Sequence, residues 1–302
     1  MESAPITDAA ATAVCANGFR RRRAAFAVWC VVLVAAFFKP LCDLARLAAT
    51  DLHSHTLLIP FISAYLIYVE RRRLPGQSTT SWLPALVLGG VALGLVVIAN
   101  GAKALALGKE GPTALLILAF VGLVMAGGFV CLGAPWMRAA AFPMAFLVFM
   151  APLPERIVFH VEHWLKLASA ETAAWFFDLA GTPVLHDGVF FRLPGILIEV
   201  AQECSGIRSS YVLFMVSLIA AYLFLRSPWR RAILVAVVIP LGIVRNGFRI
   251  LVLGWLCVQY GPQMIHTWIH HRGGPVFFVL SLIPLFLLLY GLWRGEQRKK
   301  RA

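Results

Sequence analysis

The chain has 302 residues, of which 60% are hydrophobic and 14% are charged, and its mean hydropathy is +0.81. This composition excludes a disordered chain and an ordinary soluble domain, in which about a quarter of the residues are charged. It predicts an all-α membrane protein with several spanning helices. The net charge of +13 does not indicate a nucleic-acid-binding protein, because the distribution of the basic residues follows the membrane topology predicted below.

From the N-terminus, residues 1–18 show no structural pattern, and we expect them to be disordered. The remainder, 19–302, is predicted to be one integral membrane domain of about eight transmembrane helices, each needing roughly 20 residues. The apolar runs are 24–38, 56–69, 82–100, 113–133, 139–151, 209–225, 232–259 and 275–293. The first run follows four arginines, and we interpret it as a retained anchor, with a cleaved signal peptide as the alternative.

Basic clusters mark one face of these eight helices. They lie at Arg20–Arg23, Arg71–Arg73, Arg138, Arg226–Arg231 and Arg294–Arg301, and they hold 16 of the 27 lysines and arginines. The positive-inside rule makes this face cytoplasmic, together with both termini. The clusters therefore report topology and contact with membrane lipids.

The same topology puts residues 152–208 outside the membrane as the largest loop. Apolar residues at helical spacing over 155–180 predict an amphipathic helix along the outer surface. Residues 184–200 alternate short apolar stretches with turn residues, which predicts a small hairpin. The hairpin leads the chain to Cys204, at the start of the next span.

Cys204 stands among small and polar neighbours, which are Glu203, Ser205, Gly206 and Arg208. A helix N-terminus and nearby cations favour the thiolate form of a cysteine, which is the nucleophile in thiol chemistry. We therefore interpret Cys204 as a nucleophile. A structural thiol, or a disulfide with Cys42 or Cys257, is the alternative.

Three polar residues interrupt the run 232–259, namely Arg245, Asn246 and Arg249. One arginine alone can snorkel to the interface, but the three together indicate a functional site. Arg249 lies roughly 27 Å along the helix from Arg231, near the outer edge of a hydrocarbon layer about 30 Å thick. Arg245 lies one turn deeper on the same face, and either guanidinium can stabilise an oxyanion or bind a carboxylate.

The last outer loop carries His266, His270 and His271, and the sequence alone does not choose a general acid/base among them. A metal site is the competing interpretation, since His160 and His163 are spaced by three residues. Without a His-Glu-x-x-His motif, that spacing on an amphipathic helix is more typical of surface residues. We expect no metal and no cofactor.

These motifs resemble those of the exosortase/archaeosortase family of membrane cysteine transpeptidases. The resemblance rests on Glu199–Ser209, Asn246–Ile250 and the spacing of His270 to Gly274, with weaker matches at 51–60 and 151–154. It implies that Cys204, Arg249 and His270 are catalytic. We expect supporting roles for Arg208, Arg245, Asn246 and His271. One departure is Pro275, which stands where relatives often have an aromatic residue, and His271 stays an alternative to His270.

The resemblance also implies a substrate class. Such enzymes act on exported proteins whose C-terminal tails carry a short Pro-Glu-Pro-like motif, one membrane helix and a basic end. It implies cleavage outside a bacterial inner membrane, transfer to an acceptor, and a link to exopolysaccharide and biofilm matrix. Two other classes stay open: a transporter of lipid-linked glycans, which would tolerate Cys204→Ala, and a non-catalytic assembly subunit.

Overall fold

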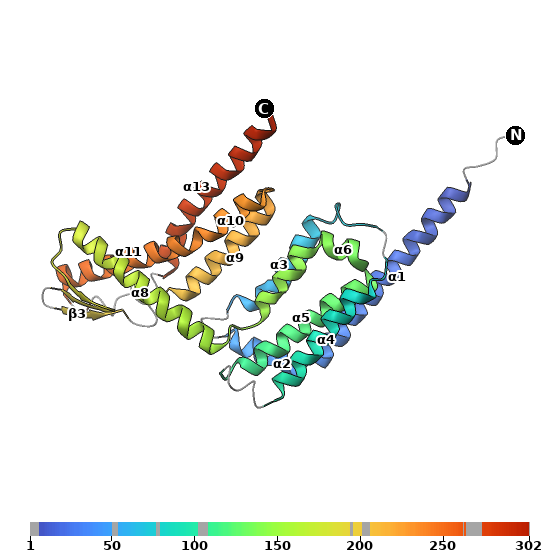
Figure 1. The fold of residues 1–302 in the computed structure, drawn as a ribbon, viewed down its shortest axis with the longest axis horizontal. Coiled ribbons are helices and arrows are strands. Elements are labelled where there is room, and N and C mark those ends of the chain that lie inside the picture. Colours follow the sequence, from blue (N-terminus) through green and yellow to red (C-terminus); the bar gives the residue numbers. More distant parts are fainter. Residues whose placement is uncertain are drawn as a thin grey trace. The chain divides into compact units, whose positions relative to one another are not determined.

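The protein is described by a computed structural model that covers residues 6–49, 54–76, 79–101, 108–193, 196–200, 206–261, 263 and 274–301. Helices make up most of these residues, so the predicted all-α membrane class is confirmed (Figure 1). The chain divides into two compact units, Met1–Ile157 and Val158–Ala302. Each unit is described by itself.

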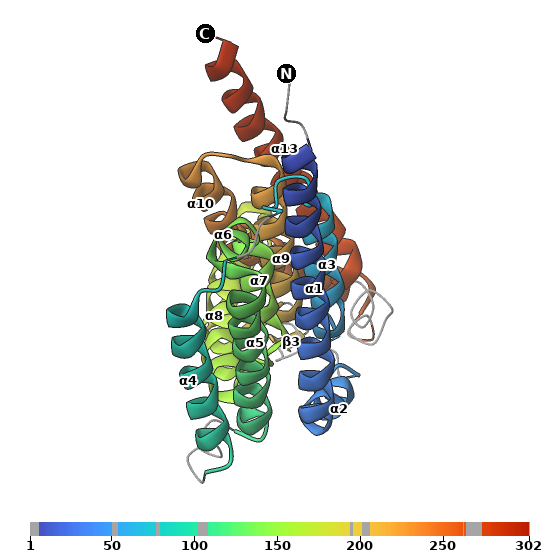
Figure 2. The ribbon, with the colours of Figure 1, turned by 90° about the vertical axis from the view of Figure 1, so that its right-hand side faces the viewer.

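The first unit is entirely helical in its described residues, apart from an isolated bridge between Thr79 and Gly133. Its elements are α1 (Ile6–Ala36), α2 (Phe38–Leu47), η1 (Thr56–Leu58), α3 (Ile59–Val69), α4 (Trp82–Ala99), α5 (Gly111–Cys131), α6 (Gly133–Ala139), α7 (Ala141–Phe146), η3 (Leu147–Met150) and the start of α8 (Glu155–Leu179). α4 runs along α5, with α1 on another side of α5 (Figure 2). A Cβ on Gly122 would lie 3.2 Å from the Cβ of Ala92, so these two helices approach closely through small residues.

Helix α1 begins at Ile6, inside the segment for which the sequence predicts disorder. The alanine-rich stretch there has a high intrinsic helix propensity, which explains the extension. The single membrane domain over 19–302 stays a prediction.

The described residues contain five helices that are long and apolar enough to cross a membrane, or up to seven if each bent pair is one span. The bent pairs are Gly18–Ala36 with Phe38–Leu47, at 72°, and Gly133–Ala139 with Ala141–Met150, at 75°. The predicted run 56–69 forms a helix of only about 21 Å, shorter than a hydrocarbon layer of about 30 Å. A multi-pass membrane protein is confirmed, and the number of eight stays a prediction.

In its described residues the second unit combines the rest of α8 with a small sheet and four helices. The elements are β1 (Leu185–Asp187), β2 (Phe190–Leu193), β3 (Ile196–Glu199), α9 (Ile207–Phe224), α10 (Pro228–Ala236), α11 (Val238–Tyr260) and α13 (Gly274–Arg301). The predicted amphipathic helix is confirmed as α8. The predicted hairpin is confirmed as β1–β2, with Asp187 opposite Phe190, and β3 adds a third antiparallel strand.

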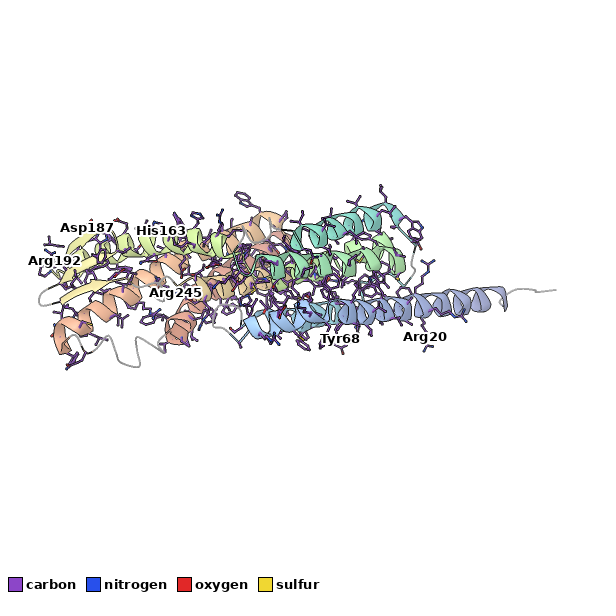
Figure 3. The ribbon with its side chains drawn as sticks, turned by 90° about the horizontal axis from the view of Figure 1, so that it is seen from below. Arg20, Tyr68, His163, Asp187, Arg192 and Arg245 are labelled. Atoms are coloured by element: carbon purple, nitrogen blue, oxygen red, sulfur yellow. The ribbon has the colours of Figure 1, made fainter. Side chains whose placement is uncertain are left out.

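Helix α8 and the sheet share a core with α11. This cluster comprises Ala170, Ala173, Phe177, Phe191, Leu193, Val200 and Ile250. α8 lies directly on α11, because a Cβ on Gly254 would come within 2.5 Å of the Phe177 ring. A second cluster, which includes Leu213, Leu234 and Leu285, holds α9, α10 and α13 together. In Figure 3 the sheet, which carries Asp187 and Arg192, lies at one end of this unit, and Arg245 lies among its helices.

Candidate functional site

The predicted site residues fall into two sets. Cys204, His266, His270 and His271 lie outside the described residues, as do Asp51 and His53 of the weaker upstream motif. Arg208, Arg245, Asn246 and Arg249 are described, and so are Val200 and Gly206 on either side of Cys204. The geometry below therefore concerns the flanks of the Cys204 segment and the polar turn of α11.

Gly206 is the N-cap residue of α9 and has a left-handed backbone, with φ of +69°. Only glycine adopts this conformation without a steric penalty. A Cβ here would also lie 3.0 Å from Nη2 of Arg245 and 3.2 Å from Oδ1 of Asn246. The glycine of the nucleophile motif is therefore required by its backbone and by its close approach to α11.

Arg245 connects α11 to this turn. Its Nη2 donates hydrogen bonds to the carbonyl oxygen of Gly206 at 3.3 Å and to Oγ of Ser210 at 3.2 Å. The residue is 7% exposed, and its Nη1 has no hydrogen-bond partner among the described residues. A buried guanidinium with an unused donor is costly in a membrane helix, and such residues typically mark functional sites.

The carbonyl oxygen of Gly206 also accepts hydrogen bonds from the first turn of α9. Oγ of Ser209 donates to it at 3.0 Å and the N–H of Ser210 at 2.9 Å, in addition to Arg245. Three donors on one oxygen fix the orientation of this peptide group. The start of α9 is consequently held in one position against α11.

Close helix contacts fix the polar turn of α11 from both sides. A Cβ on Gly242 would lie 2.8 Å from Oγ of Ser210 on α9. A Cβ on Gly247 would lie 2.9 Å from Cβ of Thr172 on α8. The turn that carries Arg245 and Asn246 thus lies between α8 and α9, and Asn246 is 2% exposed.

Arg249 and Arg208 lie at the margin of this arrangement. Arg249 is half-buried one turn further along α11, on the face predicted from the sequence, and Arg208 is exposed in the first turn of α9. The structure brings Arg245 onto the Gly206 turn. Arg245 thus contacts Gly206 and Ser210, and the roles predicted for Arg245 and Arg249 both stay predictions.

The other flank of the Cys204 segment is fixed by the sheet. Val200 is buried, and its N–H donates to the carbonyl of Val189 at 2.9 Å. One residue earlier, Oε1 of Glu199 lies 3.8 Å from Nζ of Lys166 on α8. Both ends of the segment 201–205 are therefore anchored within the same compact unit.

No three His, Cys, Asp or Glu side chains come together as metal ligands within the part of the chain that the structure describes. His160 and His163, the pair behind the competing metal interpretation, are exposed on α8. The ring of His163 stacks on Phe159 at a centroid distance of 6.4 Å. This is the surface arrangement expected for i, i+3 histidines on an amphipathic helix.

Comparison with known proteins decides the family. The model of the transmembrane exosortase family (Exosortase_EpsH) matches residues 47–287, which include α9, α11 and most of the other elements. The chain belongs to the transmembrane exosortase family. Membership supports a membrane transpeptidase. Comparisons with curated proteins and with solved structures gave no match.

Sequence reasoning missed residues that position the Gly206 turn against α11. Ser210 and Gly242 meet between α9 and α11, and Ser210 also accepts a hydrogen bond from Arg245, yet neither residue was given a role from the sequence. Two adjacent serines in the first turn of an apolar helix were the available signal. Glycines at 242, 247 and 254 of α11 were another, because small residues allow membrane helices to approach closely.

Proposed function

We propose that the chain is a membrane cysteine protease and transpeptidase that cleaves the C-terminal sorting signals of exported proteins. The signal is a tripartite tail with a short Pro-Glu-Pro-like motif, one membrane helix and a basic end. Cleavage takes place at the extracytoplasmic face of a bacterial inner membrane, and the product is transferred to an acceptor. Family membership and the resemblance in the three motifs support this proposal, including its link to exopolysaccharide and biofilm matrix.

The observation that carries the proposal is the bond from Arg245 to the carbonyl of Gly206. Cys204 precedes Gly206 by two residues, so covalent geometry limits the separation of their Cα atoms to about 7 Å. The polar turn of α11 therefore lies within reach of the proposed nucleophile. Neither the motif spacing nor the family match alone brings these two segments together.

The proposed chemistry assigns one role to each catalytic residue. The Cys204 thiolate attacks the scissile carbonyl carbon, and the guanidinium of Arg249 donates hydrogen bonds to the oxyanion that forms. His270 protonates the leaving amine, so that the carbon–nitrogen bond breaks and a thioester remains. The acceptor then loses a proton to His270 and attacks the thioester, which releases the transferred product and restores the thiolate.

The proposed topology follows from charge and helix length. Arg230 and Arg231 belong to α10 and to the basic face that the positive-inside rule makes cytoplasmic. The span Pro228–Tyr260 is 33 residues long, or about 50 Å, which exceeds the hydrocarbon layer of about 30 Å. Its C-terminal part therefore projects from the opposite face, and Arg249 falls near that boundary.

The test is processing of a tail-bearing reporter protein by the full-length chain in membranes. Wild type should shorten the reporter, and Cys204→Ser should abolish the shortened product while leaving expression unchanged. Cys257→Ala is the matched control, since Cys257 is another cysteine in the same unit, buried in α11. Processing by Cys204→Ala would favour the transporter or the assembly subunit, and equal loss in Cys257→Ala would favour a structural disulfide.

A further inference from the structure

The ends of α9, α10 and α13 meet at a cluster of arginines that the proposed catalysis does not use. We define the arginine rim as Arg226, Arg230, Arg231, Arg294 and Arg298. Leu225, Leu234 and Leu289 are buried next to it and pack the three helix ends together. The rim is therefore attached to a rigid junction rather than to a loose loop.

At this junction the carboxylate of Glu296 accepts hydrogen bonds from backbone N–H groups. Glu296 of α13 accepts hydrogen bonds from the N–H of Arg226 at 3.0 Å and from the N–H of Ser227 at 2.9 Å. It thereby caps the N-terminus of α10, where the helix dipole favours a negative charge. No guanidinium among the described residues lies within ion-pair distance of it, although Arg230 and Arg231 are near enough to attract it electrostatically.

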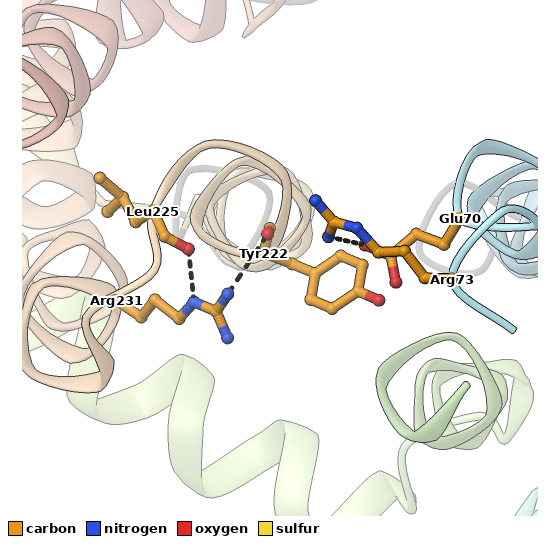
Figure 4. Close-up of polar contacts among 5 residues, drawn as sticks. All are labelled: Glu70, Arg73, Tyr222, Leu225 and Arg231. Carbon is orange, nitrogen blue, oxygen red and sulfur yellow. Dashed lines mark hydrogen bonds and ion pairs between the residues drawn. The ribbon is translucent and has the colours of Figure 1, made fainter. Parts of the chain in front are cut away.

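Two arginines of the rim are held by carbonyl oxygens. Nη1 of Arg230 donates to the carbonyl of Leu292 at 2.8 Å. Nε of Arg231 donates to the carbonyl of Leu225 at 2.8 Å, and its Nη2 lies 3.5 Å from the carbonyl of Tyr222 (Figure 4). Carbonyl acceptors fix the two side chains without neutralising them, and each guanidinium keeps donors that no described residue uses.

The rim thus presents five guanidinium charges against one carboxylate. Exposed aromatic side chains surround it: Trp229 is 73% exposed, and Tyr290 and Trp293 are exposed on α13. Tryptophan and tyrosine concentrate at the depth of the lipid headgroups in membrane proteins. Charge and aromatic residues therefore place the rim at a membrane surface, where the complementary anion is a lipid phosphate.

We propose that the arginine rim binds the headgroup of an anionic phospholipid. The phosphate oxygens accept hydrogen bonds from the unused donors of Arg230 and Arg231, because a guanidinium fork matches a phosphate geometrically. Arg226 and Arg294 add charge from their exposed positions. The bound lipid would hold the ends of α9, α10 and α13 together, and this role does not depend on the proposed catalysis.

The experiment compares the full-length protein in vesicles of phosphatidylcholine alone and of phosphatidylcholine with phosphatidylglycerol. Two quantities are measured, the midpoint of thermal unfolding and the phosphatidylglycerol retained on the protein in native mass spectrometry. The test variant is Arg226→Gln/Arg294→Gln, whose side chains are exposed and hold no backbone carbonyl in the described structure. The control is Arg21→Gln/Arg72→Gln, which removes two exposed charges from basic clusters of the other unit.

We expect phosphatidylglycerol to raise the unfolding midpoint of wild type and of the control. In the rim variant the affinity for this lipid should fall on the order of thirtyfold, since each arginine near the surface contributes about a factor of five. Equal losses in both double variants would overturn the proposal in favour of diffuse surface charge. No preference of wild type for phosphatidylglycerol would also overturn it. Inorganic phosphate added to phosphatidylcholine vesicles should have no effect, and stabilisation by it would assign the rim to a soluble anion.

Discussion

Replacement of Arg245 by methionine should lower the activity of the protein without lowering its thermal stability. The substitution keeps most of the side-chain length but removes the buried charge. The carbonyl of Gly206 retains the donors of Ser209 and Ser210, so only Oγ of Ser210 loses a partner, at a cost of about 1 kcal/mol. Against this, a buried guanidinium carries a desolvation penalty of several kcal/mol, and Nη1 offsets none of it in the described structure. Arg245→Met should therefore unfold at the same temperature as wild type or at a higher one.

Activity should respond in the opposite direction. Without the guanidinium the Gly206 turn loses its hydrogen bond to α11, and a misplacement of about 1 Å near a nucleophile costs on the order of a hundredfold in rate. Processing of a tail-bearing reporter, measured beside thermal unfolding in the same membranes, tests both parts. Arg245→Lys is the control, because it keeps the charge and a donor and should retain measurable activity. A methionine variant that processes normally, or one that unfolds several degrees earlier, would refute the reasoning.

The first of the other predictions is tested in intact cells, and the rest use the same reporter and membranes. An impermeant maleimide should label Cys204 in intact cells when it is the only cysteine, and labelling only after permeabilisation would reject the eight-span topology. Arg249→Lys should lose about a hundredfold or more in rate, because an ammonium does not reproduce the planar fork at an oxyanion, and full activity would remove Arg249 from the site. His270→Ala should eliminate processing, whereas loss only in His271→Ala would move the general acid/base by one residue. Gly206→Ala should lower the unfolding temperature and the rate together, because a left-handed backbone costs an alanine about 1–2 kcal/mol and its Cβ meets Nη2 of Arg245 at 3.0 Å.

The helices of this protein follow closely from its apolar runs. The runs 82–100 and 113–133 become Trp82–Ala99 and Gly111–Cys131, and 209–225 becomes Ile207–Phe224. The number of spans does not follow in the same way. The run 139–151 belongs to a helix pair bent by 75°, and a bend depends on tertiary packing rather than on hydropathy.

The three strands of the sheet could have been predicted from the turn residues in the sequence. Turn residues at Asp187-Gly188 and at Pro194-Gly195 divide 184–200 into three apolar stretches, and the structure forms three strands there. A third strand was thus implied by the second turn, although the interpretation stopped at a hairpin. The pairing of β3 with β2 buries Val200 and so anchors the chain just before Cys204.

The choice between the two arginines of α11 was beyond the sequence. Periodicity places Arg245 and Arg249 on one face, and depth in the bilayer favours the outer one. How closely the guanidinium of Arg245 approaches the turn before α9 depends on how closely the helices pack, and that distance is fixed by glycines facing Ser210 and Thr172. Glycines without a functional side chain therefore allow the guanidinium of Arg245 to bond to Gly206. For this reason a motif can identify the reactive groups of a membrane site, while their assignment to particular contacts requires the helix interfaces.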